Sequence, residues 1–242
     1  MYAERQPEPA LESWVECTWS LEMSAAAPAY PVWPDGCMDL LYSPGVSLDL
    51  VGPMTTVQRF DLQAGERREG LRFRPGMARR FFRMNAAELR DRAIPLETLI
   101  GSRARALRAR LDGAESSAGR SSLLNAALLG CAPRPGPIQL AIAAMTQAYG
   151  AVDLDWVAGQ AGMSARQFRR RCLQESGLGP KHLARVLRFR RAWELAARGE
   201  SWLRVAVEAG YFDQAHLVRD FREFAGAAPV SVFSKTAGRP IG

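Results

Sequence analysis

A run of arginines follows a short turn signal in the C-terminal part of the chain. Gly162-Met163-Ser164 is followed by ARQFRRRC, in which Phe168 and Cys172 would share the buried side of a helix. The outward positions of that helix carry long polar side chains: Arg166, Gln167, Arg169, Arg170 and Arg171. Because arginine can bind guanine O6 and N7 through two hydrogen bonds, this helix has the chemistry of a major-groove reader.

The residues before this run predict a helix that would position it. Apolar residues recur there at helical spacing, namely Leu154, Val157, Ala158 and Ala161. Gly162 follows where a tight turn needs a positive φ, which glycine adopts without steric cost. Met163 would fill the turn, and Ser164 would cap the next helix through its side-chain oxygen. Two helices joined in this way form a helix-turn-helix unit.

The same succession of capped helix, glycine turn and second capped helix is predicted between residues 201 and 224. Ser201 caps a helix whose inward residues are Val205, Ala206 and Ala209. Gly210 and Tyr211 make the turn, and Asp213 caps a helix whose buried residues are Leu217, Phe221 and Phe224. Its outward polar residues are Gln214, His216, Arg219 and Arg222. One such unit is equally typical of a helical hairpin in a core, but two in tandem predict a DNA-binding domain.

One long helix is predicted between the two units. Residues 180–197 would span about 27 Å at roughly 1.5 Å per residue, and Pro180 suits a first helical turn. This length would place the recognition helices, expected at 164–175 and 213–224, near one DNA turn of about 34 Å apart. We expect one chain to read two successive major grooves and to bend the DNA. The arginines of the long helix are expected on a solvated face, or against the DNA backbone: Arg185, Arg188, Arg190 and Arg191.

The charge of the chain is concentrated in the same part. The 242 residues carry a net charge of +7, and 48% of them are hydrophobic, enough for one large core or two smaller ones. Residues 136–242 hold 15 Lys and Arg against 9 Asp and Glu, whereas residues 1–135 hold 17 Arg against 16 acidic residues. A basic domain attracts polyanions such as nucleic acid. The abundance of Arg and Ala over Lys indicates a bacterial genome rich in GC.

The sequence lacks the residues that several other classes of function need. Histidine occurs only as His182, interpreted as structural, and His216, so a His-based metal site or a nucleophile–His pair is excluded from residues 1–181. The cysteines show no CxxC pairing and are typical of structural thiols in a reducing cytoplasm: Cys17, Cys37, Cys131 and Cys172. No signal peptide pattern and no run of 18 apolar residues occurs. We therefore expect a cytoplasmic protein with no catalytic residue, no metal, no cofactor and no membrane contact.

The N-terminal part has another pattern. Residues 32–45, 46–53 and 70–76 each resemble a short strand bounded by turn residues. Short helices are predicted for 77–84 and 86–92, the second capped by Asn85. Further on, 102–111 and 123–130 have helical propensity, 113–122 is turn-like, and the prolines of 133–137 suggest a linker. Asp35, Cys37 and Asp39 offer oxygen and sulfur atoms that could form a ligand site, but a turn and the start of a strand is the favoured interpretation.

The second helix-turn-helix unit resembles the AraC/XylS family of transcription regulators. The motif is V-A-x-x-A-G-Y-F-D-x-x-H-L-x-R-x-F-R-x-x-x-G-x-x-P-x-x-x-F from Val205 to Phe233, and the G-x-x-P step from Gly177 to Pro180 also fits. The resemblance covers roughly residues 138–236. The chain departs from the family by carrying Ala215 and Ala228 where serine is usual, and Phe233-Ser234 in place of Tyr-Arg.

The resemblance implies roles for individual residues. It implies base contacts for Arg166, Arg169, Arg170, Gln214, His216 and Arg219. Phosphate contacts or supporting roles fall to Ser164, Arg171, Asp213 and Arg222. Arginine at the first three positions favours G-rich half-sites, although each of these arginines could instead contact only phosphate.

The N-terminal residues resemble the sensor domain of an uncharacterised, cupin-like subgroup of the same family. The matching segments are 34–41, 70–78 and 86–101. This resemblance implies an effector-binding or dimerising β-domain but names no ligand. Aromatic walls with a few polar groups would suit a small molecule, and the candidates are Trp14, Trp19, Trp33, Arg72 and Arg74. The alternative is that the tryptophans only fill a small core.

These inferences combine into an α+β architecture. We predict a small β-barrel, cupin-like sensor domain at 1–100, a helical linker or dimerisation segment at 101–135, and an all-α domain of about seven helices with two helix-turn-helix units at 136–236. The expected function is sequence-specific transcription regulation. The expected partners are double-stranded DNA, a small-molecule effector, RNA polymerase and a second copy of the chain. Two alternatives stay open: a protein-interaction module with secondary DNA binding, and a cupin-type enzyme.

Overall fold

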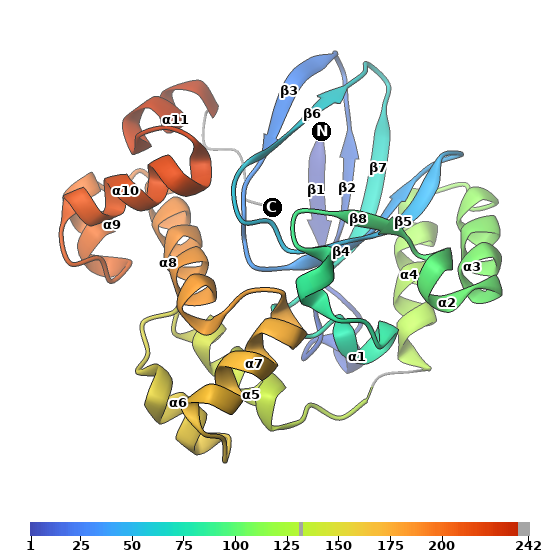
Figure 1. The fold of residues 1–242 in the computed structure, drawn as a ribbon. Helices are drawn as coiled ribbons and strands as arrows, with labels where there is room; N and C mark the ends of the chain where they lie inside the picture. Colours follow the sequence, from blue (N-terminus) through green and yellow to red (C-terminus); the bar gives the residue numbers. More distant parts are fainter. Residues whose placement is uncertain (131–132, 237–242) are drawn as a thin grey trace.

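The N-terminal part is built on one antiparallel sheet. The computed structural model describes residues 1–130 and 133–236, and Figure 1 shows the sheet beside a group of helices. Its six strands lie in the order β1-β2-β7-β4-β5-β8. Their bounds are β1 (Tyr2–Arg5), β2 (Val15–Glu22), β4 (Met38–Ser43), β5 (Ser47–Val51), β7 (Arg67–Phe73) and β8 (Ala93–Pro95). Along β4 buried and half-buried residues alternate, because successive side chains point to opposite faces of the sheet.

A separate ribbon lies against this sheet. It consists of β3 (Ala27–Val32) and β6 (Gln58–Leu62), which pair with each other and with no strand of the sheet among the described residues. The strand-rich class predicted from the sequence is confirmed, and the three predicted strands correspond to β4, β5 and β7. The barrel is not closed, however, because the ribbon and the sheet share no hydrogen-bonded edge in the described part of the chain.

Short helices complete the N-terminal core. They are η1 (Pro9–Leu11), α1 (Arg79–Phe82), η2 (Ala86–Leu89), α2 (Glu97–Ile100), α3 (Ser102–Asp112) and α4 (Ser117–Leu129). The side chain of Asn85 accepts a hydrogen bond from the Ala87 amide, as expected of the cap of η2. Leu107 and Leu111 of α3 and Leu124 and Leu128 of α4 are buried in the same core as the sheet. These two helices therefore cover the sheet rather than span a gap between domains.

One local prediction in this region was wrong. Residues 113–122 were expected to be turn-like, but α4 already begins at Ser117. The side chain of Ser116 accepts a hydrogen bond from the Gly119 amide at 3.1 Å and caps the helix. The buried face of α4 then outweighs the weak helical propensity of its serines and glycine. The linker expected near 133–137 adjoins residues 131–132, which lie outside the described residues.

The C-terminal part is helical throughout. Its described helices are α5 (Pro137–Gln147), α6 (Leu154–Gln160), α7 (Ala165–Ser176), α8 (Pro180–Ala197), α9 (Trp202–Glu208), α10 (Gln214–Ala225) and α11 (Pro229–Thr236). This number agrees with the seven predicted, and α8 has the predicted bounds. An aromatic cluster holds the second unit to α8: Trp193 stacks on Phe221, and Phe189 meets Phe221 at 4.9 Å between ring centroids. In the described ranges no helix is both long and apolar enough to span a membrane.

Both helix-turn-helix turns have the local geometry that the sequence predicted. Gly162 and Gly210 have φ values of 65° and 76°, in the region that favours glycine. Ser164 and Gln167 form a capping box at the start of α7. Asp213 accepts a hydrogen bond from the His216 amide at the start of α10. The recognition helices thus begin one residue after each expected cap.

The capping box at α7 allows a direct test of local stability. Ser164→Ala removes the side-chain acceptor for the Gln167 amide and should lower the free energy of unfolding by about 1 kcal/mol. The measurement is urea unfolding followed by circular dichroism. Ser122→Ala is the matched control, because Ser122 is exposed within α4, and it should change stability by less than about 0.5 kcal/mol. Equal effects of the two substitutions would contradict the assigned cap.

Candidate nucleic-acid interface

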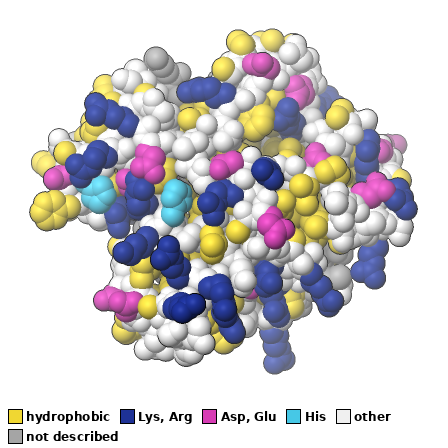
Figure 2. Space-filling model, viewed as in Figure 1, with side chains coloured by type: hydrophobic (Ala, Val, Ile, Leu, Met, Phe, Trp, Pro, Cys, Tyr) yellow, Lys and Arg dark blue, Asp and Glu magenta, His cyan; other side chains and the backbone are white. Residues whose placement is uncertain are grey.

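Helix α7 presents a row of exposed arginines. Arg166, Arg169, Arg170 and Arg171 are all exposed, while Phe168 and Cys172 are buried on the opposite side. Within the described residues none of these four guanidinium groups forms an ion pair. Figure 2 shows Lys and Arg side chains gathered over this region of the surface. A helix that carries cations without carboxylate partners is free to bind an anionic or hydrogen-bonding ligand.

Helix α10 is less cationic at its surface. Gln214, Arg219 and Arg222 are exposed, but His216 is half-buried and its ring meets that of Tyr211 edge-on at 5.1 Å. Sequence reasoning did not select Phe212, which precedes the cap and is 93% exposed. So large an exposed aromatic side chain at the start of a recognition helix is a candidate contact residue. Phe212 could have been selected from the sequence, because it directly precedes Asp213, the predicted cap of this helix.

The arginines of α8 do not form a solvated face. Arg185 binds the buried carboxylate of Asp220 at 2.7 Å and lies over the ring of Phe224. Arg188 lies over Tyr211, and Arg191 lies over Tyr149. The solvated-face prediction for these side chains was therefore wrong, because each packs against another part of the protein. This result separates the engaged arginines of α8 from the unpaired ones of α7.

His182, at the start of α8, is half-buried and its ring meets Phe224 edge-on at 5.7 Å. Burial lowers the pKa of His182, and the nearby Arg185 lowers it further. This environment favours the neutral ring and agrees with the structural interpretation made from the sequence.

The N-terminal part holds the C-terminal end of α7. Arg79 donates to Glu175 at 2.7 Å, and Arg90 donates to the carbonyl of Gly177 at 3.1 Å. A Cβ atom on Gly177 would lie 2.5 Å from Pro53 Cγ, so the two segments are in direct contact. The end of the first recognition helix is thereby fixed to the N-terminal part at several points.

The end of α10 is held by the same part of the chain. The Val57 amide donates to the carbonyl of Phe224 at 2.9 Å. Pro53 and Val57 both belong to residues 52–57, which connect β5 to β6 and which we call the bridging segment. The bridging segment therefore contacts the C-terminal ends of both recognition helices.

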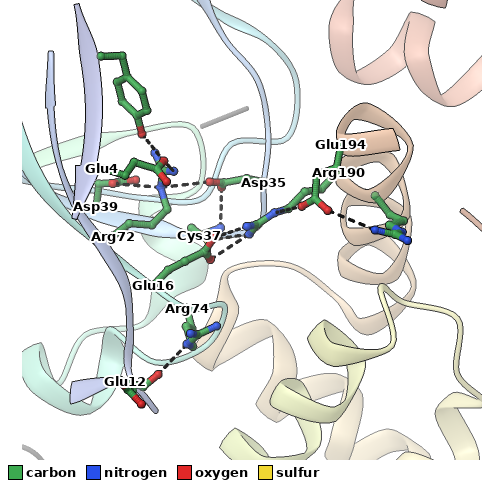
Figure 3. A network of polar contacts seen from close by, with 12 residues as sticks. Glu4, Glu12, Glu16, Asp35, Cys37, Asp39, Arg72, Arg74, Arg190 and Glu194 are labelled. Carbon is green, nitrogen blue, oxygen red and sulfur yellow. Dashed lines mark hydrogen bonds and ion pairs between the residues drawn. The ribbon is translucent and has the colours of Figure 1, made fainter. Parts of the chain in front are cut away.

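The linker helix is held by a buried ion pair. Arg190 of α8 donates to both carboxylate oxygens of Glu16 on β2, with Nη1 at 3.0 Å from Oε2. Each side chain is only 18% exposed. Burial would raise the pKa of Glu16, but the hydrogen bonds and the charge of Arg190 outweigh it and lower that pKa to about 2. Figure 3 shows how this pair continues into Cys37, Asp35, Arg72 and Asp39.

The N-terminal part contains a cavity of about 230 Å³ between the sheet and the ribbon. Trp19 and Arg72, two of the five effector candidates, line it. The other three lie elsewhere: Trp14 is buried in the N-terminal core, Trp33 packs on Trp193 at 4.3 Å, and Arg74 donates to the carbonyl of Glu12. The bridging segment also reaches the cavity, because Gly52 and Met54 are among its lining residues.

Asp39 and Arg72 form the polar end of this cavity. Asp39 Oδ1 accepts a hydrogen bond from Trp19 Nε1 at 2.6 Å and lies 3.5 Å from Arg72 Nε. Arg72 is 4% exposed and also lies 3.4 Å from both Asp35 and Glu4. Burial is the main cause that raises the pKa of Asp39 to about 6, against the opposing charge of Arg72. Sequence reasoning assigned Asp35 and Asp39 only to a turn and a strand start, and it did not select Glu16.

The three cysteines in the described part of the chain have the environment of structural thiols. Cys17, Cys37 and Cys172 are free and buried, and burial raises the pKa of each. Cys131 lies outside the described residues. In residues 1–130 and 133–236, no cluster of three or more His, Cys, Asp or Glu side chains is arranged to hold a metal ion.

The tandem turns, the caps and the outward arginines define the C-terminal part as a helix-turn-helix DNA-binding domain. The helix-turn-helix domain family matches residues 157–235, and a domain of unknown function (DUF6597) matches residues 3–95. The helix-turn-helix match covers the part of the chain in which the sequence resembles AraC/XylS transcription regulators, and it supports that resemblance. No curated protein is matched by the sequence.

Several solved structures are similar to the chain at low identity. A DNA-binding transcriptional dual regulator from Escherichia coli K-12 is 24% identical, with 45% of this chain and 98% of that chain covered and a TM-score of 0.38. ToxT from Vibrio cholerae O395 is 11% identical, with 93% and 99% covered and a TM-score of 0.44. Unsaturated fatty acid bound wild-type ToxT from Vibrio cholerae strain SCE256 is 12% identical, with 96% and 98% covered and a TM-score of 0.45.

The Glu16–Arg190 pair makes stability dependent on acid pH. Because the pKa of Glu16 is lowered to about 2, its contribution is present above pH 4.5 and is lost as the pH falls through 2. Glu16→Gln should therefore lower the free energy of unfolding at neutral pH by about 2 kcal/mol. The free energy of unfolding of this variant should also fall less steeply than that of wild type as the pH is lowered. Denaturant unfolding at several pH values measures both effects.

Glu97→Gln is the control for this substitution. Glu97 pairs with Arg105, but both side chains are more than half exposed, so the change should be below about 1 kcal/mol and nearly independent of acid. If the two variants behaved alike, Glu16 would have no special role in holding α8.

Proposed function

We propose that this regulator reads an asymmetric DNA site with α7 and α10 in successive major grooves, under the control of a small molecule bound by the N-terminal part. The observation that carries this proposal is the difference between the arginines of α8 and those of α7. Those of α8 are engaged within the protein, whereas Arg166, Arg169 and Arg170 of α7 are exposed and without ion pairs in the described chain. Arginines kept free on one helix, in a family of DNA-binding regulators, support direct recognition of DNA.

In the first unit, Arg166, Arg169 and Arg170 would contact base edges. Bidentate binding of guanine by arginine makes G-rich half-sites the expected targets. Arg171 lies further round the helix and would contact phosphate. Ser164 supports the helix as its cap.

In the second unit, Gln214, His216 and Arg219 would contact bases. Gln214 and Arg219 are fully available, while His216 would present only the outer edge of its half-buried ring. Phe212 would add an apolar contact, such as one with a thymine methyl group. Arg222 would bind phosphate, and Asp213 caps α10.

The linker helix supports this spacing. The 18 residues of α8 span about 27 Å at roughly 1.5 Å per residue, close to the pitch of about 34 Å that separates successive turns of one groove. The remaining mismatch would be met by bending the DNA. Because the N-terminal part contacts both recognition helices and α8, this spacing is set by more than the linker alone.

The cavity is our proposed effector site. It is lined by Trp19 and Arg72 and by Gly52 and Met54 of the bridging segment, which contacts the ends of α7 and α10. A ligand that moved this segment would therefore change how the two recognition helices are held. We group 101–129 with the sensor at 1–100 and the DNA-binding domain with 136–236. Contacts with RNA polymerase, and a homodimer through α3 and α4, stay predictions.

Gel-shift titrations with genomic fragments at two salt concentrations test the regulator against a protein-interaction module. A specific regulator keeps its preference for certain fragments while its overall affinity falls with salt. Uniform binding to all fragments, or no binding, would contradict the proposal.

Arg169→Ala tests base recognition directly. Loss of a guanine contact should cost about 1–3 kcal/mol and relax specificity at one base pair, as measured by binding to a set of single-base variants of the site. Arg198→Ala is the matched control, because Arg198 is an exposed arginine that caps the end of α8 and belongs to neither α7 nor α10. A uniform loss of affinity for all sequences in Arg169→Ala would instead make Arg169 a phosphate contact.

A further inference from the structure

The cavity between the sheet and the β3–β6 ribbon has aromatic walls. Its lining includes the rings of Tyr2, Trp19, Tyr30 and Phe60, together with aliphatic side chains from β4, β5 and the ribbon. At about 230 Å³ it is smaller than the roughly 300–1,000 Å³ of pockets that hold drug-sized ligands. It therefore suits a molecule with one ring or a short alkyl body.

Arg72, at the polar end of the cavity, is surrounded by more carboxylates than its single charge can balance. Glu4, Asp35 and Asp39 all lie within 3.5 Å of the one guanidinium of Arg72, which is itself almost fully buried. These contacts are longer than the usual 2.7–2.9 Å of charge-assisted hydrogen bonds, because one cation is shared by three carboxylates. The charge of Arg72 is thus more than balanced by its own neighbours.

The other lining cations do not offset this excess. Arg68 pairs with Glu66 at 2.7 Å. Arg92 is exposed to solvent, which screens its charge, and the neighbouring Asp91 in the same lining has the opposite charge. Two carboxylates line the cavity, Asp39 and Asp91, and Asp39 is the one next to Arg72, with 19% of its side chain exposed. Its Oδ1 is held by Trp19, which fixes the carboxylate at the end of the aromatic walls.

We propose that this cavity binds a small organic cation, whose ammonium group lies against Asp39 and whose apolar body lies against the aromatic walls. The inference rests on the proposed function in one respect, that the N-terminal part binds an effector. A cation would neutralise the carboxylate of Asp39, and the rings of Trp19 and Tyr2 would add cation–π attraction. An anion would lie against Asp39 and against a guanidinium that Glu4, Asp35 and Asp39 already neutralise, so its charge would be desolvated without a free partner.

Three probes test which ligand charge the cavity prefers. They share a phenyl ring and a short chain: 2-phenylethylammonium, 2-phenylethanol and 3-phenylpropionate. Isothermal titration calorimetry on the full chain near neutral pH should show the cation binding at least about tenfold more tightly than the alcohol, and the carboxylate binding more weakly still. Preference for the carboxylate or the alcohol would overturn the proposal, and so would the absence of binding by all three at millimolar concentration.

Two substitutions locate the site. Asp39→Asn removes the charge with little change of shape and should weaken binding of 2-phenylethylammonium by about tenfold or more. Asp61→Asn is the matched control, because Asp61 lies on β6 between the lining residues Phe60 and Leu62 but is itself exposed and outside the cavity. Equal affinity of wild type and Asp39→Asn would overturn the proposal.

A third variant keeps the test decisive if Asp39→Asn fails to fold. Leu41→Phe keeps Asp39 and fills the cavity that Leu41 lines, so it should also weaken binding of the cation. If Leu41→Phe bound the probe like wild type, the site would lie elsewhere. Specific DNA binding of the unmodified chain is measured without any probe. Its absence would contradict the proposed function, whereas loss of the cation preference alone would contradict only this inference.

Discussion

The burial of α8 is the constraint on which the rest of the structure depends. A helix that joins two helix-turn-helix units fixes their separation only if it cannot turn or slide, and α8 is fixed by its buried residues. Trp193 and Phe189 pack with Phe221 of the second unit, and Leu183 and Leu187 lie in the same core. Close packing resists small displacements, so the distance between the two units is set by the core rather than by the DNA.

The same helix carries the most costly polar contact of the interface between the two parts. Taking the charges of Glu16 and Arg190 out of water is repaid only by good geometry, and Arg190 reaches both carboxylate oxygens. If the N-terminal part moved away from α8, one buried charge would lose its partner. The pair therefore opposes separation of the two parts more strongly than an exposed pair would. The hydrogen bond from Val57 to Phe224 and the contacts at Gly177 act in the same direction at the ends of the recognition helices.

The features that were predicted correctly depend on local sequence. Turn glycines, capping side chains and helical spacing act over a few residues, so both helix-turn-helix units and α8 could be assigned from the sequence. The Glu16–Arg190 pair joins residues far apart in the chain, and no local pattern indicates it. One signal was available. Val186, Arg190 and Trp193 recur at i, i+4 and i+7, so Arg190 lies on the apolar side of α8 and needs a partner. The sequence also could not predict that the barrel is open, because closure of a barrel depends on which strand edges form hydrogen bonds with each other.

Two connections run from the cavity to the DNA-binding part, and they differ in stiffness. The polar connection passes from Asp39 through Arg72 and Asp35 to Cys37 and Arg190, and several of its contacts are 3.4 Å or longer (Figure 3). Such contacts can adjust by a few tenths of an ångström without moving a helix. The bridging segment is a backbone connection, in which Met54, a residue that lines the cavity, lies three positions before Val57. A displacement of its backbone cannot be absorbed by side-chain rotation. The bridging segment is therefore the part of the structure through which a ligand in the cavity would act on α7 and α10 together, while the polar connection keeps α8 in place.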